Sequence, residues 1–206
     1  MKYGFLPKLM WTAFKKSFKK ELADTLGEKA PENVMKKAHA KYKDIIAEID
    51  EFDKNDRFII NILSCTMLSA ILLNVRGSYT TEEIRAYYRN SMNGSKAMQM
   101  AGKKKNSYTE EAREKLRWQA KWSETNDNPY SWKFSVEDGA TINQYTATFY
   151  TCGACRLMKE LGLEKYVPAM CAYDYDMAAM SNTVFTREYT LASGGPYCDC
   201  HYDHKE

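Results

Sequence analysis

The sequence predicts an α+β protein in which a helical N-terminal half packs on a four-stranded antiparallel sheet, with two helices between its hairpins. Two observations predict this fold class. Apolar residues recur at helical spacing up to about residue 126, and from about residue 131 they alternate with polar residues as in half-buried strands. We therefore expect a helical region over residues 1–126 and an α+β region over residues 127–206, integrated into one domain.

Five helices are expected before residue 126. The first has apolar residues three to five positions apart, Gly27 can end it, and Pro31 suits the opening of the next. Residues 58–75 are rich in Ile and Leu, but they include five Asn, Ser or Thr residues and lie between two arginines. A membrane span needs about 20 strongly apolar residues. We therefore expect this segment to be a helix in the centre of a soluble bundle, without membrane contact.

Two capping boxes predict further helix starts. Thr80 with Glu83, and Ser107 with Glu110, have the spacing at which a hydroxyl and a carboxylate bind the free amides of a first helical turn. The segment between these helices, residues 94–105, is expected to be a mobile connection.

The first hairpin and the two helices that follow it are expected after residue 130. Residues 131–137 alternate polar and apolar, Asp138-Gly139 provides a turn, and residues 142–151 return as a Tyr- and Thr-rich strand. A helix is expected over residues 154–161, and Pro168 opens another that runs to about residue 180.

The second hairpin is expected from residues 183–192 and 197–202, joined by the turn residues Ser193-Gly194-Gly195-Pro196. In its last strand, the two-residue period places Cys198 and Cys200 on one face of the sheet. Asp199 and His201 then lie on the other face.

The charge balance argues against a nucleic-acid partner. The formal net charge is only +3, so the basic runs over residues 15–20 and at Lys103–Lys105 are interpreted as solvent-exposed faces or loops. Residues 1–18 contain lysines throughout and have no apolar run of a secretory signal. We expect a cytoplasmic protein whose cysteines are reduced thiols.

Five of the six cysteines lie in the last third of the chain. Cys155 falls in the first turn of a helix after a strand, where free amides and the helix dipole stabilise a thiolate, so its pKa should lie below the ordinary value of about 8.5. Cys171 and Asp174 are three apart and share a helix face. A free cysteine most often acts as a small buried hydrophobe, and we assign Cys65 to packing in the helical core. We expect Cys155, Cys171 and Cys198 to come together.

Two other kinds of cysteine chemistry fit parts of this pattern. Zinc or iron is one, with candidate ligands Cys152, Cys155, Cys198, Cys200 and His201, although a regular strand is a poor source of the tight knuckle that zinc pairs favour. Thiol–disulfide exchange at the Cys152-x-x-Cys155 motif is the other, although a hairpin here replaces the βαβ unit usual for it. We expect no cofactor.

The C-terminal motifs resemble those of the L-2-amino-thiazoline-4-carboxylic acid hydrolase family. The resemblance covers roughly the last 75 residues, with a looser match before them, and its matching positions are Cys155, Cys171, Asp174, Arg187, Gly194, Cys198 and Asp199. Cys152 and Cys200 do not match, since the family usually ends in Cys-Asp-Phe followed by a basic residue.

The resemblance implies a hydrolase that opens a small cyclic C–N/C–S substrate such as 2-amino-thiazoline-4-carboxylate, giving N-carbamoyl-cysteine. Such a reaction needs a nucleophile, proton transfer and a cation for the substrate carboxylate. Our hypothesis assigns the nucleophile to Cys155 or Cys198 and proton transfer to Asp174 and Asp199. Arg187 would hold the carboxylate, and Cys171 and Gly194 would complete the substrate-binding set. The alternative is a module that binds a small ligand or metal, or senses it, without breaking a bond.

Overall fold

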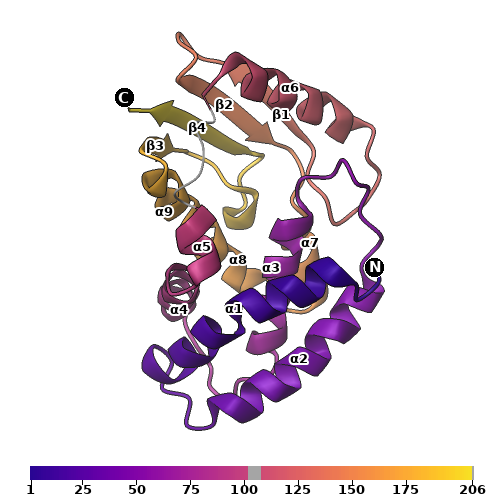
Figure 1. The fold of residues 1–206 in the computed structure, drawn as a ribbon, viewed down its shortest axis with the longest axis vertical. Coiled ribbons are helices and arrows are strands. Elements are labelled where there is room, and N and C mark those ends of the chain that lie inside the picture. Colours follow the sequence, from indigo (N-terminus) through magenta and orange to yellow (C-terminus); the bar gives the residue numbers. More distant parts are fainter. Residues whose placement is uncertain (102–107, 206) are drawn as a thin grey trace.

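Helices occupy the first half of the chain and the strands lie in the second, which confirms the predicted α+β class (Figure 1). The computed structural model describes residues 1–101 and 108–205, with the side chain of Ala101 left out. The first half contains α1 (Phe5–Asp24), α2 (Pro31–Glu48), α3 (Ile59–Leu72), α4 (Thr81–Asn93), α5 (Lys96–Ala101) and α6 (Glu110–Glu124). The second half contains β1 (Phe134–Asp138), β2 (Gln144–Phe149), α7 (Gly153–Glu160), η1 (Glu164–Tyr166), α8 (Val167–Cys171), α9 (Tyr173–Met180), β3 (Thr183–Thr186), η2 (Leu191–Ser193) and β4 (Cys198–His204).

The four strands form one antiparallel sheet in the order β1-β2-β4-β3. β4 is therefore a central strand, and it lies between the two hairpin partners β2 and β3. Its register sets Cys198 opposite Phe149 and Cys200 opposite Ala147. Because side chains alternate along a strand, both cysteines face the same side of the sheet, as predicted.

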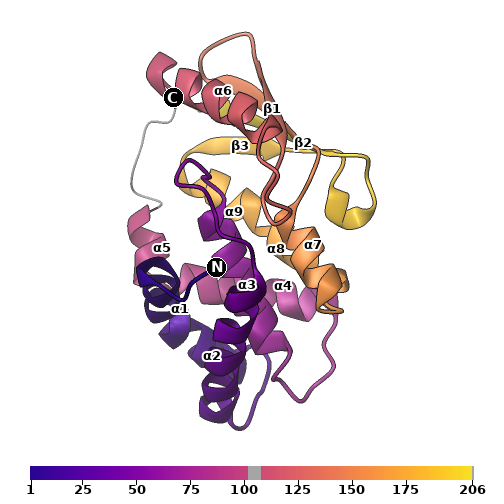
Figure 2. The same cartoon turned by 90° about the vertical axis from the view of Figure 1, so that its right-hand side faces the viewer.

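The α3 helix is the centre of the helical half. Every residue from Ile62 to Leu72 is buried, and α3 packs on α1, α2 and α7. The central helix predicted for this segment is therefore confirmed. No helix within residues 1–101 and 108–205 is long and apolar enough to cross a membrane. Figure 2 shows α7 and α8 between the sheet and helices α1–α4, with α6 on the other side of the sheet.

The helix boundaries of the first half agree with the capping analysis only in part. Thr80 and Glu83 form the predicted capping box, with backbone-to-side-chain hydrogen bonds of 3.2 and 2.7 Å. Thr109 caps α6 by accepting from the Ala112 amide. The predicted cap Ser107 and the basic run Lys103–Lys105 lie outside the described residues. The mobile connection expected from residue 94 is wrong over Lys96–Ala101, which forms α5.

The second hairpin is wider than predicted. The strand expected over residues 183–192 ends at Thr186, and the tight turn expected at residues 193–196 is replaced by a longer connection that contains η2. Its physical cause is Asp199, whose carboxylate accepts hydrogen bonds from the Glu188 and Tyr189 amides and so removes them from a strand ladder. The helix expected from Pro168 to residue 180 is likewise interrupted, at Ala172.

Arg113 fastens α6 to the first hairpin. Its side chain is 1% exposed, and the guanidinium donates to the Asp138 carboxylate at 2.6 Å and to the Gln144 and Ile142 carbonyl oxygens at 3.1 and 2.9 Å. It also lies 4.5 Å from the centre of the Tyr145 ring. A buried cation is stable only when it is paired and hydrogen-bonded, and here these partners fix the position of α6 beside the sheet.

Replacing Arg113 with leucine should lower the free energy of unfolding by about 2–3 kcal/mol, because two carbonyl groups and a carboxylate lose their donor. Arg117→Leu is the matched control, since Arg117 also binds Asp138 but is 44% exposed; its loss should stay below about 1 kcal/mol. Urea-induced unfolding of the two variants measures both values. Equal losses would contradict the anchoring role of Arg113.

Candidate functional site: a thiol-lined cavity

A cavity of about 320 Å³ lies between the inner face of the sheet and the helices. The sheet contributes Cys198 and Cys200, and the residue before α7 contributes Cys152. The α8–α9 segment contributes Cys171 and Asp174. The cavity also contains two arginines, Arg57 and Arg187, so it combines thiols, a carboxyl group and cations in one space.

Cys152 is the N-cap of α7 and has the most polar surroundings of these thiols. Its backbone is extended, and its sulfur accepts a hydrogen bond from the Cys155 amide at 3.4 Å. The Cys155 thiol, the Ala154 amide and the Trp132 side chain also donate to this sulfur. The Cys155 thiol contributes most to lowering the pKa of Cys152, and these donors together outweigh the opposing effect of burial.

Gly153 allows this arrangement to form. A β-carbon at this position would overlap the Tyr130 carbonyl oxygen and touch the Trp132 ring. Only glycine lets the chain approach so closely. The first turn of α7 therefore packs directly on the segment that contains Trp132, which brings the Trp132 side chain within reach of Cys152.

Cys155 lies in the first turn of α7, as predicted, but it is not the thiol with the low pKa. Its own pKa is raised well above the ordinary value, first because its thiol donates to Cys152 and then because it is buried. The expectation for Cys155 is therefore corrected: the helix start stabilises the thiolate of its N-cap residue, one turn earlier. Cys152 lines the cavity, and Cys155 does not.

The other cavity cysteines are neutral thiols. Burial raises the pKa of Cys171 and of Cys198, and it raises the pKa of Cys200 to about 12. Cys198 accepts from the Leu191 amide at 3.2 Å. Cys171 and Cys198 both line the cavity and both act electrostatically on Cys155, which does not line it.

Cys65 lies closer to the first turn of α7 than expected. It is fully buried in α3, as its assignment to packing requires. Its sulfur nevertheless lies 4.0 Å from the Ala154 carbonyl oxygen, directly beneath the first turn of α7.

Asp174 and Arg187 form an ion pair at the cavity wall, with 2.7 Å between Oδ2 and Nη1. Arg187 also donates to the Cys171 carbonyl at 2.6 Å, and its side chain is 8% exposed. Desolvation raises the pKa of Asp174, although Arg187 opposes the shift. The Asp174 carboxyl is therefore more easily protonated than an ordinary aspartate, and Arg187 fixes its position.

Arg57 is a cavity cation that the sequence analysis did not single out. It precedes α3 and retains exposed surface. Its guanidinium donates to the neutral Gln119 side chain at 3.0 Å, and within the described chain it has no carboxylate partner. The single sequence signal was its position at the start of the apolar helix, which does not reveal that it faces β2 and β4 across the cavity.

Besides Cys155, three residues expected at the site lie outside the cavity. Asp199 holds the connection after β3, and its pKa is lowered because the Tyr189 and Glu188 amides outweigh partial burial. His201 is on the opposite face of β4, where it contacts Thr146 at 2.8 Å and Asp199 at 3.3 Å. Gly194 ends η2 on the surface with a positive φ of 83°.

The candidate metal ligands do not converge. His201 is separated by the sheet from Cys200 and Cys152, because neighbouring side chains of β4 face opposite ways. Among the residues that the structure describes, no group of three or more His, Cys, Asp or Glu side chains is arranged to hold a metal ion.

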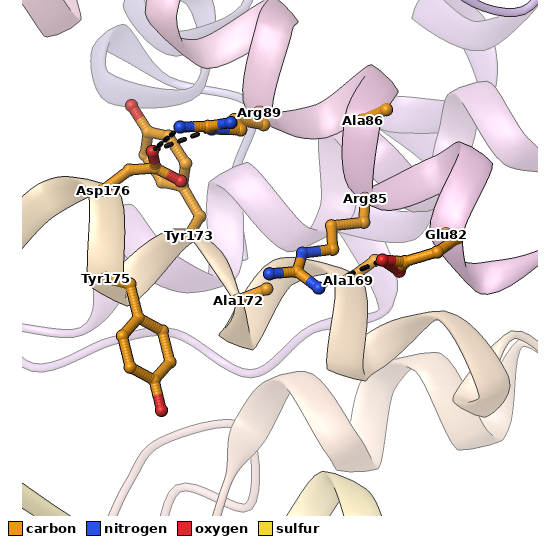
Figure 3. Close-up of a pocket in the computed structure, with 9 residues that line it drawn as sticks. All are labelled: Glu82, Arg85, Ala86, Arg89, Ala169, Ala172, Tyr173, Tyr175 and Asp176. Carbon is orange, nitrogen blue, oxygen red and sulfur yellow. Dashed lines mark hydrogen bonds and ion pairs between the residues drawn. The ribbon is translucent and has the colours of Figure 1, made fainter. Parts of the chain in front are cut away.

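Two other hollows differ from the cavity in character. A chamber of about 240 Å³ adjoins it and shares Cys152, Cys171 and Asp174 with it, but the chamber is otherwise lined mostly by apolar side chains. A separate groove of about 510 Å³ lies between α4 and the α8–α9 segment (Figure 3). In that groove Arg85 pairs with Glu82 and Arg89 with Asp176, so its cations are already neutralised.

The fold and the cavity define an α+β protein in which a cysteine of lowered pKa lines the same cavity as a carboxyl group held by arginine. The chain belongs to the L-2-amino-thiazoline-4-carboxylic acid hydrolase family, whose model matches residues 61–202. This match confirms the resemblance and covers α3 to β4, so it includes the cavity cysteines, Asp174 and Arg187. Comparison with the curated proteins and with the solved structures found no match.

Cys152 should react with iodoacetamide at neutral pH faster than the other five cysteines, because it has the lowered pKa and lines the cavity. Replacing Trp132 with phenylalanine keeps the ring but removes the N–H donor, so it should raise the pKa of Cys152 and slow its alkylation. Peptide mapping over a pH series measures both effects. Preferential labelling of Cys155 would contradict the assignment.

Proposed function

We propose that the chain hydrolyses a small cyclic C–N/C–S substrate such as 2-amino-thiazoline-4-carboxylate to N-carbamoyl-cysteine, with Cys152 as the nucleophile. The observation that carries this proposal is the Cys152 sulfur, which accepts hydrogen bonds from two amides, an indole and a thiol inside a cavity that also holds Asp174. Membership of the hydrolase family supports the class of reaction.

The first half of the reaction breaks the ring. The Cys152 thiolate attacks the carbon between nitrogen and sulfur, and the bond from that carbon to the ring sulfur then breaks. The departing sulfur takes the proton of the Asp174 carboxyl, whose raised pKa favours the protonated form. The substrate is then bound to Cys152 through its former ring carbon.

The second half releases the product. Asp174, now a carboxylate, accepts a proton from a water molecule that attacks the same carbon, and the bond to the Cys152 sulfur breaks. The carbon becomes the carbonyl of N-carbamoyl-cysteine and Cys152 returns to its starting form. The net change is the addition of one water molecule to the substrate.

The remaining cavity groups have supporting roles in this proposal. Cys155 stabilises the thiolate by donating to it, and Arg187 positions Asp174. Arg57 holds the substrate carboxylate, since it is the cavity cation without a carboxylate partner among the described residues. Cys171, Cys198 and Cys200 line the cavity as neutral thiols.

A second candidate is a module that binds a small ligand without breaking a bond. The adjoining apolar chamber of about 240 Å³ favours it, because a single polar ring would not use that space. Turnover separates the two candidates. In a binding module, the bound ligand would protect Cys152 from alkylation, but no new thiol would be released from the ligand.

Replacing Cys152 with serine should lower turnover of 2-amino-thiazoline-4-carboxylate by about a thousand-fold or more, since the nucleophile is removed. Cys155→Ser is the matched control: its hydroxyl still donates to Cys152, so turnover should fall by about ten-fold or less. Release of the product thiol measures both. If only Cys155→Ser lost activity, the nucleophile would be Cys155, the position that the family pattern shares.

Replacing Arg57 with glutamine should raise KM for the carboxylate substrate by about 10- to 100-fold, the effect of losing a charged hydrogen bond. With 2-amino-thiazoline, which lacks the carboxylate, the variant and the parent protein should have similar KM values. Arg187→Gln should instead lower kcat for both substrates, because it releases Asp174. An equal loss for both substrates in the Arg57 variant would exclude carboxylate binding by Arg57.

A further inference from the structure

Cys152 and Cys155 are joined by hydrogen bonds across the first turn of α7. The Cys155 thiol donates to the Cys152 sulfur, and the Cys155 amide reaches the same atom at 3.4 Å. The two residues are separated by one helical turn, roughly 5 Å, which is within the span of about 4.4–6.8 Å between the α-carbons of a disulfide. Little movement is needed to join them.

The two thiols also differ in position and in chemical state. Both are half-buried, and Cys152 lines the cavity whereas Cys155 is not part of its wall. The hydrogen bond between the two side chains is the main reason why the pKa of Cys152 is lowered and the pKa of Cys155 is raised. Burial adds to the rise in the pKa of Cys155. This is the division of labour of a thiol that an oxidant attacks and a thiol that resolves the product.

We propose that Cys152 and Cys155 are a modification site for peroxide, at which oxidation forms a reversible disulfide between them. The closing of this disulfide masks Cys152, so under the proposed function it also stops hydrolysis. The formation of the disulfide itself does not depend on that function.

The chemistry is balanced by the peroxide alone. The Cys152 thiolate attacks one peroxide oxygen, the O–O bond breaks, and the hydroxide released takes a proton to become water, which leaves a sulfenic acid. The Cys155 sulfur then attacks the sulfenic sulfur, the S–O bond breaks, and the proton of Cys155 leaves with it as a second water molecule. Two thiols have lost two electrons to one peroxide, and a reducing thiol reverses the change.

The neighbouring cysteines are weaker partners for Cys152. Cys198 is on a central strand and its sulfur is held by the Leu191 amide. Cys171 is the last residue of α8, and Arg187 donates a hydrogen bond to the Cys171 carbonyl oxygen. Neither makes a hydrogen bond to Cys152 that matches the one from Cys155.

The sequence allows a direct test with hydrogen peroxide and trypsin. Residues 134–156 form one tryptic peptide whose two cysteines are Cys152 and Cys155. Cys171 falls in the peptide 166–187, and the last two cysteines fall in 188–205. The protein is treated with one equivalent of hydrogen peroxide, free thiols are alkylated without reduction, and the peptides are identified by mass spectrometry.

The expected result is an unalkylated 134–156 peptide that is two hydrogens lighter than its reduced form and is restored by dithiothreitol. In Cys155→Ser, Cys152 should instead stop at a sulfenic acid that dimedone traps. Cys171→Ser, the matched control, should form the disulfide as the parent protein does.

Three results would overturn the proposal: two alkylated cysteines in peptide 134–156 after treatment, or a disulfide that links this peptide to 166–187 or to 188–205. Turnover before and after oxidation tests the consequence for hydrolysis separately. If the disulfide forms but the reduced protein hydrolyses no thiazoline, the proposed function fails and the modification site stands.

Discussion

The close packing of the first turn of α7 on the Tyr130 carbonyl is the constraint on which the rest of the site depends. It requires glycine at position 153, and it brings Trp132 to the N-cap of the helix. The same chain leaves β2 at Phe149, which pairs with Cys198 of β4. The sheet register and the helix start are therefore connected within a few residues, and together they set Cys152, the N-cap of α7, and the two thiols of β4 on one cavity.

The ion pair between Arg187 and Asp174 is the reason why we assign the substrate carboxylate to Arg57 and not to Arg187. The Arg187 guanidinium lies 5.3 Å from the Tyr175 ring centre and 5.2 Å from that of Phe185, with Asp174 and the Cys171 carbonyl as its polar partners. Removing a cation from water to this degree is costly unless its partners stay in place. A substrate carboxylate would have to displace Asp174 to reach it. Arg57 meets no such competition, and it lies just before the segment that the family model matches.

The sequence predicts those parts of the fold that local patterns control. The two-residue period correctly placed Cys198 and Cys200 on one face, and the apolar run correctly predicted the buried α3. It did not reveal the Asp199 carboxylate ending β3, because that contact joins residues ten or eleven apart. The sequence also did not reveal Cys152 as the N-cap of α7, because helix N-caps are usually recognised as Ser, Thr, Asp or Asn. The low pKa was therefore predicted for Cys155, in the turn that follows. The position of Arg57 on the cavity wall depends on tertiary packing alone, so no local sequence pattern predicts it.

The contact that makes Cys152 reactive also exposes it to oxidation. A hydrogen bond from a thiol stabilises the Cys152 thiolate without adding a charge to the cavity, which leaves Asp174 free to hold a proton. An amide or a hydroxyl in the same place would stabilise the thiolate too, but it could not join to it. Because the donor is the Cys155 sulfur, the same two atoms stabilise the Cys152 thiolate and form the disulfide. A substitution that separates the two sulfurs would alter both properties. The choice of cysteine at position 155 therefore couples nucleophilic reactivity to the redox state of the surroundings.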